Sequence, residues 1–272
     1  MPAGGFIGLP PFQWIALLVA LLTVLVLIDA WAGHYRRGFI HRAQYAPFVS
    51  GGVLIICTVA AAIAPRTHAI EAALTWAGWL AIAAGLLGFC WHHYYGITAK
   101  PGGYRRILNS VMYGAPPLAP LSLTAMGVFT LIIGQGLAGA SDLAGVPLST
   151  ALLATVVVCL LGAILQAGLL HFRGAFNNPL MYAPFTVPVL TALMGIWTMA
   201  QPSATARVTL GGLFWLTLVT GFVGLGMHLR GFDRQMAGLY VALFNWLQGP
   251  PAMAPALFAG LAAIGLVTTG LL

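Results

Sequence analysis

The residues best suited to chemistry in this chain are four histidines, each at the C-terminal end of a long apolar stretch. They are His34, His93, His171 and His228. Neutral imidazole is a frequent ligand of transition metals and of haem iron. The pattern therefore predicts a metal ion or a porphyrin held by histidines on facing helices. A plainer alternative stays open, because a cation at a helix C-terminus is stabilised by the helix dipole without binding any ligand.

Helical spacing favours an inward orientation for three of these side chains. Residues four apart lie on one helix face, and small residues mark the faces along which membrane helices pack closely. Counting back in fours from His93 passes Gly85 and Ala81. The same count from His171 and His228 also passes mainly through small residues, so we expect these three histidines to point into the bundle.

A polar pair accompanies the histidines in each half of the chain. Asp29 is the only carboxylate inside an apolar stretch, and Arg36 shares its helix face about 10 Å further along the axis. Gln166 and Arg173 stand in the same arrangement 137 residues later. An acid inside a membrane span is a functional-site candidate by default. We expect a buried hydrogen-bonding site here; a salt bridge at the membrane surface, in the first half alone, is the alternative.

Several other kinds of site are absent from the sequence. No apolar stretch carries two histidines four residues apart, so there is no zinc site of the HExxH kind. The three cysteines all fall inside apolar stretches and lack metal-ligand spacing. Lys100 is the only lysine and lies between stretches, so it cannot form a buried Schiff base with retinal.

Composition sets the class of protein. The chain has 272 residues, of which 60% are apolar and only 6% are charged, whereas an ordinary soluble domain has roughly 25% charged residues. So few charges cannot cover a water-soluble surface. The composition therefore excludes a soluble enzyme, a disordered tail and a nucleic-acid binder, and it indicates a polytopic all-α membrane protein in a lipid bilayer.

Eight stretches are long enough to cross a bilayer, which takes about 20 mostly apolar residues. They run over 12–33, 46–64, 72–93, 114–137, 148–171, 181–200, 207–229 and 252–272. None shows the period-two alternation of a transmembrane β-strand. The segments 103–113 and 238–246 lie between spans, and we expect each to form a short helix in the membrane interface.

The basic residues indicate the orientation of the spans. Nine of the 11 Lys and Arg residues follow spans one, three, five and seven, and only Arg66 and Arg207 lie on the opposite side. Basic loops stay on the cytoplasmic side. We therefore expect a multi-pass protein of the inner (cytoplasmic) membrane of a bacterium, with both termini on the outer, periplasmic side.

The chain contains an internal repeat. Seven residues recur at a shift of 137: His34, Arg36, Phe39, Tyr45, Ala46, Pro47 and Phe48 correspond to His171, Arg173, Phe176, Tyr182, Ala183, Pro184 and Phe185. A second set recurs at a shift of 135: His93, Gly96, Gly103, Gly114, Pro116 and Pro120 correspond to His228, Gly231, Gly238, Gly249, Pro251 and Pro255. This order of matches predicts two tandem four-helix units, 1–137 and 138–272. An even number of spans gives both units the same direction, related by a pseudo-twofold axis along the membrane normal.

These features favour an integral membrane subunit of a larger redox or energy-converting complex, of respiratory or photosynthetic type. It would anchor partner subunits and hold haem b or a chlorophyll-type pigment through the four histidines. The short connections leave no room for a catalytic domain, so we expect no catalysis by the isolated chain.

Two other functions fit the sequence. One is a transporter or channel for a small solute or anion, with Arg36, Arg173 and Arg230 as a cationic rim that attracts the anion. The other is a membrane-embedded metalloenzyme acting on a lipid or quinone, for which four histidines and one Asp make a small ligand set.

Overall fold

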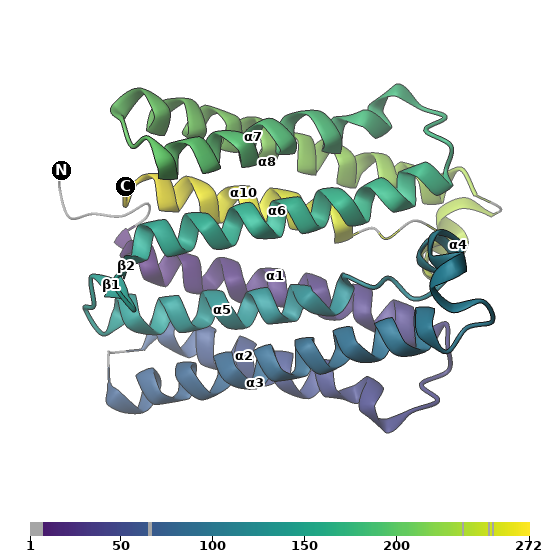
Figure 1. Ribbon diagram of the computed structural model, residues 1–272, viewed down its shortest axis with the longest axis horizontal. Helices are drawn as coiled ribbons and strands as arrows, with labels where there is room; N and C mark the ends of the chain where they lie inside the picture. Colours follow the sequence, from purple (N-terminus) through teal and green to yellow (C-terminus); the bar gives the residue numbers. More distant parts are fainter. Residues whose placement is uncertain (1–7, 65–66, 236, 250, 252) are drawn as a thin grey trace.

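The computed structural model describes residues 8–64, 67–235, 237–249, 251 and 253–272 (Figure 1). Within this part, seven helices are long and apolar enough to cross a membrane. Long apolar runs fold as helices in a bilayer because a helix pairs its backbone polar groups internally. The chain is thus an all-α, multi-pass membrane protein, with one small β-hairpin between its halves.

The first half, residues 8–137, contains five α-helices. They are α1 (Pro11–Tyr35), α2 (Ala46–Ile63), α3 (His68–His93), α4 (Ile107–Tyr113) and α5 (Ala119–Leu137). A π-helical turn over Tyr94–Thr98 extends α3, and short 3-10 turns over Arg42–Tyr45 and Gly103–Arg106 precede α2 and α4.

The second half begins with the hairpin and has the same order of helices. Strands β1 (Asp142–Leu143) and β2 (Val146–Pro147) pair in antiparallel fashion. They lead into α6 (Leu148–Arg173), α7 (Ala183–Ala200), α8 (Ala204–Asp233), α9 (Ala242–Gln248) and α10 (Met253–Thr269). Short 3-10 turns over Pro179–Tyr182 and Gly238–Val241 precede α7 and α9, as in the first half.

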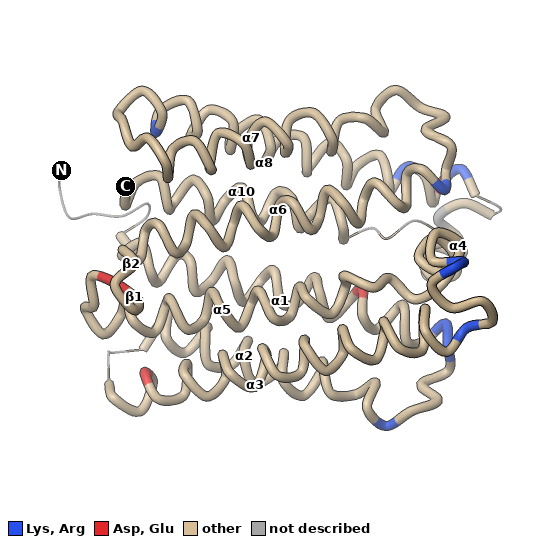
Figure 2. The backbone as a smooth tube through the Cα atoms, viewed as in Figure 1, with Lys and Arg blue, Asp and Glu red and all other residues tan. Residues whose placement is uncertain are grey.

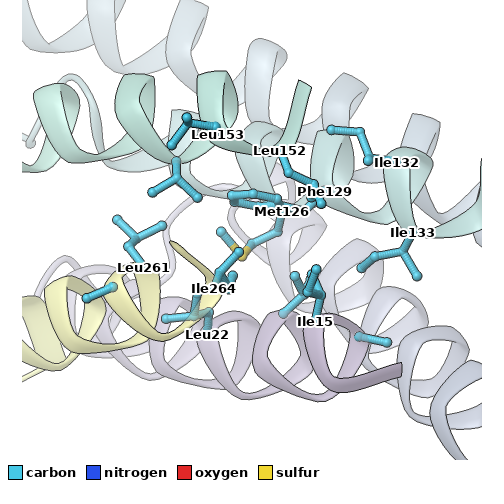
Figure 3. Packing of buried hydrophobic residues seen from close by; sticks show 14 of the residues in the cluster. Ile15, Leu22, Met126, Phe129, Ile132, Ile133, Leu152, Leu153, Leu261 and Ile264 are labelled. Atoms are coloured by element: carbon cyan, nitrogen blue, oxygen red, sulfur yellow. The ribbon is translucent and has the colours of Figure 1, made fainter. Parts of the chain in front are cut away.

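Four helices form the centre of the bundle, and a helical pair flanks it on each side. Both α1 and α6 pack against α5 and α10 in the centre, while α2 and α3 lie on one side and α7 and α8 on the other (Figure 1). Most of the buried side chains of the four central helices are apolar. Figure 3 shows Leu22 of α1, Phe129 of α5, Leu153 of α6 and Ile264 of α10 among them.

Two helices, α5 and α10, are at least four residues shorter than the spans predicted for them. The stretch 114–137 is helical only from Ala119, because two prolines at 116 and 117 lack a backbone N–H and disfavour helical geometry before them. The last helix, α10, has 17 residues, or about 25 Å of length against a hydrocarbon core of about 30 Å. Both α5 and α10 thus follow proline-rich segments.

Close helix contacts recur at matching places in the two halves. A Cβ atom on Gly85 of α3 would lie 2.8 Å from the carbonyl oxygen of Pro120 in α5. One on Gly221 of α8 would lie 2.8 Å from that of Pro255 in α10. Glycine is needed at both positions because the facing backbone leaves no room for a side chain.

The π-helical turn after α3 changes the match between the halves. A π-turn accommodates one extra residue in a helix, and α8 continues without such a turn to Asp233. The residue numbers of matching positions therefore differ by 136 before the turn, as for Gly85 and Gly221, and by 135 after it. By its contacts His92, rather than His93, resembles His228, because each ring donates from Nδ1 to the carbonyl oxygen of a proline.

The charged residues gather at the two ends of the bundle (Figure 2). Most Lys and Arg residues lie at the end that carries α4. Glu71 and Arg207 lie near the starts of α3 and α8, and Asp142 lies in β1, at the opposite end of the bundle. This separation leaves the helix centres free of charge among the described residues, and Asp29, in the C-terminal third of α1, is the charged residue farthest from a helix end.

Candidate functional site

The first half brings together two imidazoles, one from α1 and one from α3. The ring centroids of His34 and His92 lie 6.1 Å apart, and the rings meet edge to face at 82°. His34 was predicted as a site residue, whereas its neighbour His92 was passed over in favour of His93.

The second half holds a matching pair on α6 and α8. The ring centroids of His171 and His228 lie 6.4 Å apart at an angle of 85°. Both residues were predicted as site residues, and all four paired rings are partly buried at the Lys- and Arg-rich end. The structure thus gathers the histidines into two pairs, one in each half.

A backbone carbonyl holds one ring of each pair in place. The Nδ1 atom of His92 lies 2.9 Å from the oxygen of Pro116, and that of His228 lies 3.0 Å from the oxygen of Pro251. A carbonyl oxygen only accepts hydrogen bonds, so each Nδ1 donates and, in a neutral ring, each Nε2 keeps a lone pair. Histidines that ligate a metal are commonly oriented in this way by an outer carbonyl.

His93 lies away from both pairs. Its Nε2 atom is hydrogen-bonded to the hydroxyl of Tyr104, and its ring packs on Phe89. The geometry of the helix explains why His92 points inward instead. Seven residues make almost two full turns, so His92 shares the face of Gly85, whereas His93 is turned by a further 100°. The seven-residue spacing was the signal that the count in fours missed.

The other ring of each pair differs between the halves. In the first half, the backbone N–H of His41 donates to Oε1 of Gln44 over 2.8 Å, and Nε2 of Gln44 lies 3.1 Å from Nδ1 of His34. The first bond fixes the amide so that its NH₂ group donates to His34. In the second half, Met181 stands at the position of Gln44, and Nδ1 of His171 is buried without a hydrogen-bond partner.

In each half, a phenylalanine in an unusual backbone conformation packs against the paired histidine at the end of α1 or α6. Phe39 has φ 47° and Phe176 has φ 46°, in a left-handed region that costs a bulky residue about 1–3 kcal/mol. Each accepts this conformation while its N–H donates to the carbonyl oxygen of His34 or His171. Each ring also stacks on a tyrosine, with centroids 4.9 and 4.8 Å apart. Each phenylalanine thus contacts both its histidine and a tyrosine.

The predicted polar residues of α1 and α6 have different surroundings. The carboxylate of Asp29 interacts with the backbone N–H of Met253, the first residue of α10. A carboxylate at a helix N-terminus satisfies a free N–H group and complements the helix dipole. At the corresponding place in α6, Oε1 of Gln166 is buried without a partner. Asp29 therefore has a structural role that Gln166 lacks.

The predicted arginines lie at the Lys- and Arg-rich end. Burial lowers the pKa of Arg36, the nearby Asp29 acts in the opposite direction, and Arg173 lowers it further. Two arginines from different halves therefore lie close enough to repel each other. Arg173 also lies over the ring of Tyr113, 5.2 Å from its centroid. Arg230 is exposed in the last turn of α8, and we find no interaction of its side chain with these groups in the described part of the chain.

Larger ligand clusters are missing from the residues that the structure describes, since no three His, Cys, Asp or Glu side chains there come together in a way that could hold a metal ion. Each candidate site therefore offers two imidazoles. Comparison with protein-family models, with curated proteins and with solved structures finds no match to this chain.

Proposed function

We propose that the chain is an integral membrane subunit of a redox or energy-converting complex and that it holds a haem group at the His171–His228 pair. The observation that carries this proposal is the state of the two rings. The backbone oxygen of Pro251 holds His228 with its Nε2 lone pair available. No side chain donates to Nδ1 of His171, so this ring can carry its proton on Nδ1 and also offer its Nε2 lone pair.

The geometry of this pair suits a single metal centre with two imidazole ligands. The ring centroids of His171 and His228 lie 6.4 Å apart, so one metal centre could contact both imidazoles. A bare zinc ion takes four protein ligands in a structural site, which this pair does not supply. Haem iron brings its own macrocycle and uses axial histidines. A chlorophyll-type pigment takes a single axial ligand and so would leave one imidazole unused.

The first pair fits such a group less well. Gln44 donates to Nδ1 of His34, so a neutral His34 carries its proton on Nε2 and has no lone pair there for a metal. We therefore assign the haem to the second half and a packing role to the His34–His92 pair.

The membrane arrangement proposed with this function has eight spans in two repeats, residues 1–137 and 138–272, related by a pseudo-twofold axis along the membrane normal. The recurring glycine contacts and histidine pairs support the repeat. The concentration of Lys and Arg at one end supports a cytoplasmic location for the histidines and an outer location for both termini, in a bacterial inner membrane.

Partner subunits would supply the rest of the reaction. Where the structure describes the connections between helices, they contain no folded unit larger than the hairpin and the short helices α4 and α9. A haem held by His171 and His228 would supply one-electron chemistry at the end of the bundle where such a partner would dock. The isolated chain would then bind cofactor and show no turnover.

A visible spectrum of the purified protein tests the proposal. We expect a Soret band that shifts on reduction with dithionite. In His228→Ala and in His171→Ala the band should lose roughly nine-tenths of its intensity, because both histidines would hold the iron. His93→Ala is the matched control, since this ring faces elsewhere, and should keep the band. A folded protein without any haem band, or equal loss in His34→Ala, contradicts the assignment.

A second candidate function is anion transport, favoured by the proximity of Arg36 and Arg173 between the halves. Two neighbouring arginines at a helix-bundle end attract anions. Proteoliposomes loaded with a chloride-sensitive dye distinguish this function, because a carrier would give chloride flux that Arg36→Gln reduces, whereas a haem subunit would give none.

A further inference from the structure

A polar pocket lies where α7 leads into α8, at the end of the bundle opposite to α4. Its volume is about 250 Å³, several times the roughly 30 Å³ that a water molecule takes up in the liquid. The walls come from the end of α7, the connection, the first turn of α8 and the residue after α10: Thr198, Pro202, Ser203, Ala204, Arg207 and Leu272. The pocket therefore has room for a small polar group.

Arg207 brings a positive charge to this pocket without an internal partner. Its guanidinium forms no ion pair with a carboxylate of any described residue, Leu272 included, and no hydrogen bond or ring contact with these residues. Its place in the first turn of α8 is unfavourable too, because the helix dipole already puts positive charge there. The described part of the fold thus supplies no anion for this cation.

Ser203 adds a hydroxyl on the same wall. Its Oγ atom accepts a hydrogen bond from the backbone N–H of Ala206 over 3.1 Å and so caps α8. A hydroxyl can donate while it accepts, and this hydrogen has no acceptor among the described residues. The pocket therefore offers the N–H groups of Arg207 and the O–H group of Ser203 as free donors.

The start of α3 is the matching place in the first half. Thr67 caps α3 by accepting from the N–H of Ile70, as Ser203 caps α8 by accepting from that of Ala206. These two caps are 136 residues apart, the same difference as between the close-contact glycines of α3 and α8. The residues that follow the caps can therefore be compared position by position.

The charge is reversed between these two helix starts. Glu71 stands at the position of Arg207, and its Oε2 atom lies 3.1 Å from Nδ1 of His68. An acid suits the first turn of a helix, and Ala204 takes the place of His68 in the second half. The first half thus pairs its charge within the chain, whereas the second half has an unpaired cation at the wall of a pocket.

We propose that this pocket binds a phosphate group, from the head group of a phospholipid or from inorganic phosphate, and that Arg207 and Ser203 hold it. The planar guanidinium matches two oxygens of a phosphate, and such charge-assisted hydrogen bonds are stronger than neutral ones. The serine hydroxyl donates to a third oxygen. The first turn of a membrane-spanning helix lies at the depth of the lipid head groups, so phosphates are within its reach.

This binding requires neither the proposed haem nor anion transport. The pocket lies at the start of α8, whereas His171, His228, Arg36 and Arg173 lie at the other end of the bundle. His228→Ala should therefore lose haem and still bind phosphate at Arg207.

The test follows the Nε–Hε signal of Arg207 by NMR in the full chain, with isotope-labelled arginine, in dodecyl maltoside micelles. Arg207→Gln assigns this signal by its absence. The probes are inorganic phosphate, dioctanoyl phosphatidylglycerol, and dioctanoylglycerol, which has the same acyl chains and no phosphate. We expect a saturable shift with at least one of the two phosphate probes and none with dioctanoylglycerol. Saturation at the lower concentration shows whether the lipid or the free anion is the better ligand.

Two variants at matching helix starts show which residues hold the phosphate. Ser203→Asp keeps a good helix cap but replaces the hydroxyl donor by a negative charge. We expect it to weaken binding at Arg207 by at least roughly tenfold, because the charge repels phosphate. Glu71→Gln is the control at the start of α3 and should leave the affinity unchanged.

Three results would overturn the inference. The first is the absence of a saturable shift with both phosphate probes. The second is an equal shift with dioctanoylglycerol, which would show that the acyl chains alone are bound. The third is wild-type affinity in Ser203→Asp, or a loss of the same size in Glu71→Gln. The thermal stability of each variant shows that it is folded.

Discussion

The two halves of this protein hold the same pair of imidazoles in different states. In the first half, a chain of hydrogen bonds from His41 through Gln44 satisfies the ring on α1. In the second half, Met181 stands in place of Gln44 and cannot form these hydrogen bonds, so Nδ1 of His171 has no partner. The comparison teaches that the scaffold sets where the rings meet, whereas a single side chain beside them decides whether a ring is free to bind.

A second contrast lies deeper in the central helices. Asp29 meets the N-terminus of α10, whereas Gln166, 137 residues later, has a buried oxygen without a partner. The first half again satisfies its polar group within the protein, and the second half does not. Substitutions at corresponding positions test how far this difference between the halves extends.

The largest expected effect is one that the halves share. Gly85→Ala and Gly221→Ala each place a Cβ against backbone atoms, 2.6 Å from the nitrogen of Thr124 and 2.7 Å from that of Ala259. Helices would have to move apart, so we expect each change to lower the free energy of unfolding by about 3 kcal/mol. Titration with SDS in bicelles measures this loss.

The control for these variants is Gly226→Ala, where a Cβ has no neighbour within 4 Å. It should be neutral or slightly stabilising, because alanine favours the helix. If Gly85→Ala lowers the free energy of unfolding strongly while Gly221→Ala leaves it unchanged, the close contacts of the two halves are not equivalent.

A smaller effect should separate the halves. Asp29→Leu removes the group that meets the first N–H of α10, and we expect a loss of about 1–2 kcal/mol. Gln166→Leu removes an amide oxygen that has no partner, so its effect on stability should be near zero or favourable. The same SDS titration measures both variants.

Asp29→Asn keeps an acceptor oxygen and should recover most of the loss in Asp29→Leu. If Asp29→Leu is as stable as the wild type while Gln166→Leu unfolds early, the roles assigned to these two residues are reversed.

The smallest expected effect concerns the turn after α1 and α6. Gly38 has φ 76°, and Ala175 stands at the corresponding position with φ 57°. A left-handed conformation costs alanine about 1 kcal/mol relative to glycine. Ala175→Gly should therefore raise the free energy of unfolding by about that amount, and Gly38→Ala should lower it equally. Changes of the same sign in both variants would argue against a common turn geometry.

The membrane class, the helical stretches and the histidines at their ends were predictable from the sequence. Apolar run length is a local property, and a span of this length leaves the backbone no alternative to a helix. The late start of α5 was also encoded locally by its two prolines, although the predicted span ran through them. The predicted short helices near 103–113 and 238–246 are helical in the structure, with a 3-10 turn leading into each.

Which histidines pair with each other could not be predicted from the sequence. Choosing His93 over His92 followed from counting in fours, which drifts by 40° at each step because a helix has 3.6 residues per turn. The π-helical turn of Tyr94–Thr98 accommodates one extra residue, which cannot be seen in the sequence. Comparison of residue types alone therefore matched His93 with His228. The contacts of Gly85 and Gly221 with α5 and α10, and the hydrogen bonds of His92 and His228 to proline carbonyls, show which residues have matching surroundings.

The sequence by itself determined that this chain enters a membrane, which end of its helices carries the basic residues, and which residue types are present for chemistry. These follow from the transfer of side chains out of water, a property of each segment alone. The tertiary structure decided which imidazoles meet and which polar atoms keep a partner. Those depend on side chains from helices far apart in the sequence, such as Gln44 beside His34 and Met181 in its place beside His171, and on the packing that brings them within a few ångströms.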